Sequence, residues 1–526
     1  MLLLPQLGDN PEANTLPVSS EFTMRGVLFV GCIALACAHT TPTASPPPLT
    51  DWREVGSAHF RLRTDLPEGA ARETLGKLDD LRTWLQAAWS TGGDSPGTTN
   101  VIVLSNANEL WTFTHLSGIA TTSRQGPVIV VAGTGSEFLF GDRSPQQQVL
   151  AHEVAHDLIR RRMPGAPRWF HEGLATYLQT VFQRDDRHIR FGLSSVWNAP
   201  HRKWVTDPEV AIYGPDPPAT HILPLDTLGT VRWEDATPSE IVQLYWSACI
   251  WIYLLRTGEP ERMSALEAAL ASGTPWRVAW ARLRNGLDPD RLREKLFGFG
   301  WKTEVREIPS GSPRAPPVSE RALAPWEVHL CLAELWSLAA RMPGGSGLAP
   351  RVRSEVEAAA AAAPDRPAPE VWLADLETDR DVRRERAEAL VHRFPGNADA
   401  LVFRARGLRD DGGSVEGRRD AALEAVTAAP DNVDALTAHA IEEIRTGDAD
   451  GALRTVRRAE ELEPWNPTVF VAQALVLGSI GRCDDAVEAI QRALDVLPDN
   501  PPLADLRALV RERERIRGAC HPTAAR

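Results

Sequence analysis

The feature of this 526-residue chain that most restricts its fold is a spacing of 34 residues that recurs toward its C-terminus. Proline, glycine and alanine all keep this interval, at Pro430, Pro464 and Pro498, Gly447 and Gly481, Ala452 and Ala486, and Ala459 and Ala493. A period of this length indicates stacked helix pairs, in which small residues let two helices touch and proline ends the second helix. The spacing therefore predicts an all-α array, with an unrelated helical bundle as the alternative.

The repeating segment resembles tetratricopeptide repeats, and the sequences APDN and LPDN mark two of its helix ends. Pro395 and Pro364 continue the series upstream at intervals of 35 and 31, so the earlier repeats are expected to be degenerate. The resemblance implies an all-α tetratricopeptide-repeat solenoid of roughly four or five repeats, ending in a capping helix, over residues 326–517. It also implies a protein partner that binds at the repeats.

The N-terminal segment has the order of a signal peptide. Arg25 precedes an apolar run from Gly26 to Cys37, which is too short to span a bilayer. Because the run ends at Ala36-Cys37, it resembles the lipobox of bacterial lipoproteins, which implies lipidation at Cys37. Cys32 is a weaker second candidate, and an ordinary secretory signal is the alternative.

Residues 1–50 are therefore expected to hold a signal and a tether rather than part of a fold. Met24 stands where the signal would begin, so we expect it to be the true start of the protein. A Pro/Thr/Ser-rich tether follows Cys37. Lipidation would anchor the protein to a membrane of the bacterial cell envelope, facing the periplasm or at the outer membrane; without it the protein would be secreted.

Between residues 51 and 304 the patterns predict strands first and helices after, an α+β arrangement. The expected strands are 59–66, 100–105 and 127–133, and the expected helices are 69–89, 146–163, 169–182, 238–256, 259–271, 275–284 and 288–298. The Pro/Ser-rich segment 305–325 is expected to be a linker between this domain and the repeats.

The segment AHEVAH carries the residues with the clearest chemistry. His152 and His156 are four apart on an expected helix, so both imidazoles project from one face and can bind Zn²⁺. Glu153 follows the first histidine and is placed to act on water beside the metal, as in the HExxH motif of zinc peptidases. A catalytic zinc ion needs a third protein ligand, and Glu172 on the next expected helix is the best candidate.

The segments HEVAH and WFHEGLATY together resemble a gluzincin, a zinc metallopeptidase whose third ligand is a glutamate on the following helix. The similarity is greatest to bacterial peptidase MA-like domains and covers about residues 51–300, including WREVGSAHFRLRTD and LYWSACIWIYLL. It implies a zincin-like fold, with His152, His156 and Glu172 as ligands and Glu153 as the base. Thr176 stands where thermolysin-like enzymes have an aspartate, and Asp157 is a candidate partner for a ligand. The aminopeptidase GxMEN motif is absent, which favours endopeptidase action.

The resemblance also suggests roles for residues outside the motif. Tyr245 best matches the downstream tyrosine with which related enzymes stabilise the oxyanion, and a structural tyrosine in a helix core is the alternative. His171 is expected to be a structural or rim residue, because it points about 100° away from Glu172 around a helix. The strand Pro127–Gly133 could pair with an extended peptide, or be a plain core strand.

Composition narrows the function classes. The formal net charge of −13 argues against a general nucleic-acid binder, and Cys249 lies in an apolar helical run that predicts a small core residue. Two functions remain. The first is an exported zinc peptidase that hydrolyses peptide or protein substrates and recruits a substrate or partner through its repeats. The second is a non-catalytic lipoprotein scaffold that acts through the repeats alone.

Overall fold

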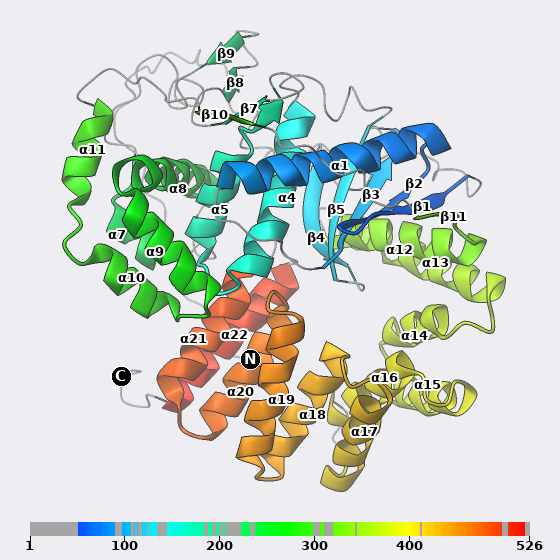
Figure 1. The fold of residues 1–526 in the computed structure, drawn as a ribbon. Helices are drawn as coiled ribbons and strands as arrows, with labels where there is room; N and C mark the ends of the chain where they lie inside the picture. Colours follow the sequence, from blue (N-terminus) through cyan, green and yellow to red (C-terminus); the bar gives the residue numbers. More distant parts are fainter. Residues whose placement is uncertain are drawn as a thin grey trace, which may run out of the picture.

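The computed structural model describes most of the chain after residue 50 (Figure 1). The described residues are 51–89, 97–106, 110, 113, 118–123, 126–133, 145–183, 188–191, 196–198, 203–205, 222–231, 236, 238–297, 306–309, 319–341, 345–410, 413–496 and 503–520. The expected signal, the start at Met24 and the lipidation sites Cys32 and Cys37 lie outside them. No helix in these ranges has the length and apolar character needed to cross a membrane.

A six-stranded sheet forms the centre of the first half of the chain. Its order is β11-β1-β2-β3-β5-β4, with β2, β3 and β5 parallel and the other neighbours antiparallel. The strands are β1 Arg53–Gly56, β2 Phe60–Thr64, β3 Thr99–Leu104, β4 Gly118–Ser123, β5 Gly126–Ala132 and β11 Ser319–Ala322. Parallel strands need a crossover, and helix α1 (Glu68–Trp89) provides it between β2 and β3.

Both faces of this sheet are covered, which explains why β3 is apolar at successive positions. Val101 and Val103 pack into one hydrophobic cluster, while Ile102 and Leu104 pack into another on the opposite face. This division follows from the two-residue period of a strand. Helices α1, α4 (Pro145–Arg162), α5 (Arg168–Leu178) and α8 (Pro238–Gly258) contribute to the first cluster.

The second face is covered by helices that the sequence assigned to the other domain. Helices α12 (Pro325–Arg341) and α13 (Ala349–Ala362) pack against it, with the Trp336 ring 4.6 Å from the Phe113 ring. The prediction that residues 305–325 form a linker between two domains is therefore wrong. β11 pairs with β1, and β10 (Arg306–Pro309) pairs with β7 (His188–Phe191), so this segment returns to the first domain twice. Its prolines and serines favoured a linker, but they did not reveal the two short strands.

From Pro325 onward the described residues form helices and no strands, as the 34-residue period predicted. Helices α12 to α21 form five successive pairs in the described chain, and α22 (Leu503–Cys520) follows them. The pairs after α13 are α14 Pro367–Asp375 with α15 Arg380–Arg393, α16 Ala398–Asp410 with α17 Val415–Ala428, α18 Val433–Arg445 with α19 Ala449–Leu462, and α20 Pro467–Ser479 with α21 Cys483–Asp495.

The repeated glycines have a conformational reason. Gly447 and Gly481 link the two helices of their pairs with φ of 89° and 76°, a left-handed conformation that favours glycine. Asn432 and Asn466 start the first helices of these same pairs by accepting hydrogen bonds from backbone N–H groups in the first helical turn. The 34-residue period therefore reflects the residues that form the turns as well as the alanines that pack between helices.

Most expected helices and strands of the first half are present within a few residues. Of the six-stranded sheet, the sequence did not predict β1, β4 and β11. The expected strand Pro127–Gly133 is β5, which pairs on both sides and so has no open edge for a peptide. Cys249 is the expected core residue: it is a free, buried thiol, and burial raises its pKa. The remaining elements of the described residues are β6 Phe182–Gln183, β8 Val196–Asn198, β9 Lys203–Val205, α7 Leu225–Thr230, α9 Pro260–Ala271, α10 Trp276–Arg284, α11 Pro289–Phe297 and the short 3₁₀ helix Gly345–Leu348.

The shared core makes a prediction about stability. Trp336→Ala should lower the free energy of unfolding by about 3–5 kcal/mol, because it leaves a cavity between α12 and the sheet. Leu423→Ala is the control, since Leu423 lies on a repeat helix and is 47% exposed. Urea denaturation followed by circular dichroism measures both. Equal effects of the two changes would contradict the shared core.

Candidate metal centre

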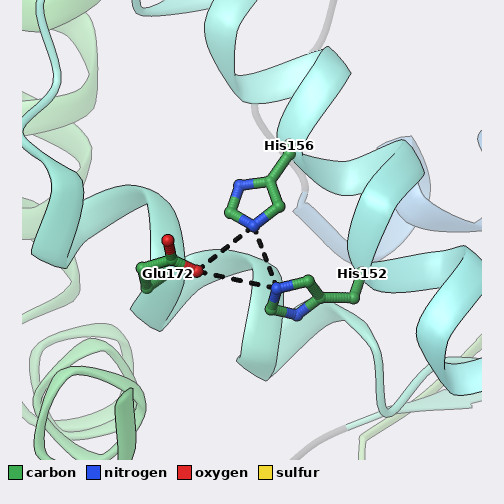
Figure 2. A group of neighbouring side chains, drawn as sticks. All are labelled: His152, His156 and Glu172. Carbon is green, nitrogen blue, oxygen red and sulfur yellow. Dashed lines mark hydrogen bonds and ion pairs between the residues drawn. The ribbon is translucent and has the colours of Figure 1, made fainter. Parts of the chain in front are cut away.

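Two consecutive helices bring the expected ligands together (Figure 2). His152 and His156 lie one turn apart on α4, and Glu172 lies on α5 after the loop 163–167. The two histidine Nε2 atoms are 2.9 Å apart, and Glu172 Oε2 lies 3.6 Å from His152 Nε2 and 3.3 Å from His156 Nε2. All three residues are buried, so their polar atoms converge where water has little access.

This geometry fits a zinc ion. Two ligand atoms bonded at about 2.0–2.2 Å to a tetrahedral ion stand roughly 3.3 Å apart, which is close to the three separations observed. Glu172 Oε2 is buried and has no hydrogen-bond partner in the described chain, although it faces two imidazole nitrogens. A cation between the three atoms would satisfy that oxygen. Two imidazoles and one carboxylate are also a donor set that zinc prefers.

Two neighbouring side chains, neither of which was predicted from the sequence, hold the ligands in orientation. Gln179, the C-cap of α5, places its Oε1 3.0 Å from His152 Nδ1. This contact favours the tautomer with a proton on Nδ1, which leaves Nε2 free for a metal. Arg168 Nε lies 3.4 Å from Glu172 Oε1, so it holds the carboxylate by the oxygen that faces away from the histidines. The spacing of Arg168 and Glu172, four residues on a helix, was the available signal.

Asp157 does not take the role considered for it. Its Oδ2 accepts hydrogen bonds from the Thr99 hydroxyl and from Arg161 Nε, the latter at 2.9 Å. The buried carboxylate therefore ties α4 to β3 and to its own last turn. It fixes the helix that carries the histidines without contacting a ligand through these bonds.

Three further residues of the motif region surround the cluster. Glu153 is buried beside His152 on α4. The Tyr245 ring of α8 stacks near the His152 ring, with centroids 6.4 Å apart. The His171 ring lies 6.3 Å from the His156 ring and is 3% exposed, so it is a buried neighbour rather than a rim residue. The structure thus brings together four expected site residues of α4 and α5 and places Tyr245 next to them.

Gly173, the residue after Glu172, explains how α8 packs so closely against α5. A Cβ added at Gly173 would lie 2.7 Å from the backbone carbon and oxygen of Ala248. Only glycine allows this approach of α5 and α8, because any side chain would push the helices apart. The close packing of α5, which carries Glu172, against α8, which carries Tyr245, therefore depends on the absence of a side chain at Gly173.

Comparisons with known proteins bear on the repeats. No protein-family model and no curated protein sequence matches the chain. Similar solved structures include a thermophilic TPR protein from Thermus thermophilus, with 20% identity over 37% of this chain and 98% of that chain and a TM-score of 0.28. They also include PilF of Pseudomonas aeruginosa, with 13% identity over 38% and 92% and a TM-score of 0.27.

A third similar structure is YrrB, described as a TPR protein with an unusual peptide-binding site. It has 13% identity over 36% of this chain and 91% of that chain, with a TM-score of 0.24. At TM-scores this low the similarity establishes no function. The tetratricopeptide repeats of this chain are identified by their 34-residue period and by their helix pairs.

Proposed function

We propose that this chain is a zinc metallopeptidase, exported and lipid-anchored at Cys37, whose repeats recruit a protein substrate or partner. The observation that carries the proposal is the convergence of His152, His156 and Glu172 in one buried cluster, with Glu153 beside it. A non-catalytic fold has no need of this combination of ligands and base. The disulfide at Cys483 supports export, because such bonds form in oxidising compartments.

The residues suggest how the reaction would proceed. A zinc ion held by the three ligands would supply a Lewis acid that polarises the scissile carbonyl. Glu153 would accept a proton from the attacking water on its carboxylate and later deliver it to the leaving amine. Tyr245 would donate its hydroxyl proton in a hydrogen bond to the developing oxyanion. An extended substrate could pair with β4, which ends the described sheet order and lies antiparallel to β5.

A lipoprotein scaffold without catalysis is the second candidate. It is supported by the five helix pairs of the repeats, because stacked helix repeats form extended surfaces that bind partners. In that case the repeats would bind a protein partner and the first domain would serve as their support. The two candidates differ in whether Glu153 matters to any function of the protein.

Removing ligands and base separately tests the metallopeptidase. His152→Ala, His156→Ala and Glu172→Ala should each lower zinc content, since each removes a ligand. Glu153→Gln should keep zinc, because the base is not a ligand, and should slow peptide cleavage about 10²–10⁴-fold. Metal content by mass spectrometry and cleavage of a quenched fluorescent peptide library are measured on the same preparations.

The control for these changes is His392→Ala, which removes an exposed histidine of a repeat helix. It should alter neither zinc content nor cleavage. Loss of zinc in Glu153→Gln would show that the roles are wrongly assigned. Cleavage that Glu153→Gln leaves intact, or no cleavage by a zinc-loaded wild type, would favour the scaffold.

Gln179 gives a prediction that is independent of turnover. Gln179→Leu should weaken zinc binding about 10–100-fold, because His152 loses the group that orients its ring. Gln179→Glu should retain binding, since a carboxylate also accepts from Nδ1. Competition with a chelator measures the dissociation constant, and Gln183→Leu, at an exposed glutamine of β6, is the matched control. Equal affinities of Gln179→Leu and wild type would exclude this orienting role.

The role of Tyr245 can be tested apart from the ligands by removing a single oxygen atom. Tyr245→Phe should keep zinc but lower kcat about 10²–10³-fold, because it removes only the oxyanion donor. Tyr253→Phe, on the same helix, is the control and should leave kcat unchanged. If both changes leave kcat unchanged, Tyr245 is a packing residue.

A further inference from the structure

The last repeats touch the loop that joins the two ligand helices. The Arg161 guanidinium, at the end of α4, lies 4.5 Å from the centre of the Trp465 ring in the loop between α19 and α20. A Cβ built on Gly165 in the 163–167 loop would lie 4.0 Å from Arg492 Nε of α21. The repeats therefore meet the first domain at the point where its chain passes from the histidines to the glutamate.

An ion pair makes a second contact between the same two parts. Arg277 Nη2 on α10 lies 2.5 Å from Glu488 Oε2 and 4.0 Å from Asp485 Oδ1, both on α21. The Arg277 side chain is 59% exposed, so water and salt screen this attraction. Contacts of this kind are weak singly and depend on ionic strength.

Both contacts lead directly to ligand-bearing helices. Arg161, which stacks on Trp465, also donates to Asp157, the residue after His156. On the other side, Trp276 beside Arg277 packs 5.9 Å from Trp169, which precedes Glu172 by three residues. Movement of α21 would thus bear on α4 through Arg161 and on α5 through Trp169.

The other end of the array is fixed to the same domain. Helices α12 and α13 share a hydrophobic core with the sheet, so the repeats leave the domain there and return to it at α20 and α21 (Figure 1). The first domain and the repeats thus form a closed ring of helices and sheet, joined at α12 and α13 and touching again at α20 and α21. Because the two parts are one chain, the effective concentration of the returning end is high, and weak contacts suffice to keep this ring closed. The same weakness lets the ring open when a competing force acts on it.

We propose that the contacts of Arg277 with Glu488 and of Arg161 with Trp465 form a latch. This latch holds the repeats against the 163–167 loop between α4 and α5 and keeps the three ligands at binding distance. A protein that engages the repeats and draws α21 away would then loosen the metal site. This regulation rests on the proposed zinc site, whereas the latch itself does not.

A charge exchange tests the latch on the full, metal-free chain. Arg277→Glu and Glu488→Arg should each open the ring and increase the radius of gyration in small-angle X-ray scattering, and the double variant should restore it. Raising the salt concentration should open the wild type in the same way. Arg282→Glu is the control, because it reverses an exposed charge on the same helix and should leave the ring closed. Unchanged scattering in both single variants would overturn the latch.

Zinc affinity tests the coupling. Each single variant should weaken zinc binding about tenfold, the scale seen when groups that orient ligands are lost, and the double variant should recover it. An increased radius of gyration with unchanged zinc affinity would overturn the coupling but not the latch. A wild type that binds no zinc would contradict the proposed function and the coupling, while the scattering would still decide the latch.

Discussion

The burial of Glu172 between two histidines is the constraint on which the rest of this site depends. A carboxylate removed from water is costly unless charged or hydrogen-bonding partners compensate it. Arg168 meets one oxygen, and the imidazole nitrogens of His152 and His156 face the other. Each ligand helix is held in place by a different neighbour: Gly173 lets α5 pack closely against α8, and Asp157 ties α4 to β3.

The repeats are part of this framework rather than an appendage. Their first helix pair completes the core of the sheet, and their last pair reaches the loop beside the ligands. Loss of the repeats would expose one face of the sheet, including the apolar side chains of Ile102 and Leu104. A partner bound to the helical array would accordingly act on a structure that is continuous with the candidate metal centre.

Local patterns in the sequence predicted much of the fold and most of the site. The four-residue spacing in HEVAH, the glutamate on the next helix and the 34-residue period all express geometry within one or two adjacent helices. Gln179 and Arg168 were missed because a glutamine and an arginine have many common roles. The linker was misjudged because short strands such as Ser319–Ala322 carry little signal of their own and exist only through their partner β1.

The sequence by itself determined the helical array, its glycine turns and the set of candidate ligands, since each depends on neighbours along the chain. Only the tertiary structure decided that α12 and α13 cover the sheet, that Tyr245 approaches His152, and that Arg161 meets Trp465. These contacts join residues far apart in sequence. Their formation depends on how complete helices and sheets pack, because no local spacing specifies which distant surface will bury a given side chain.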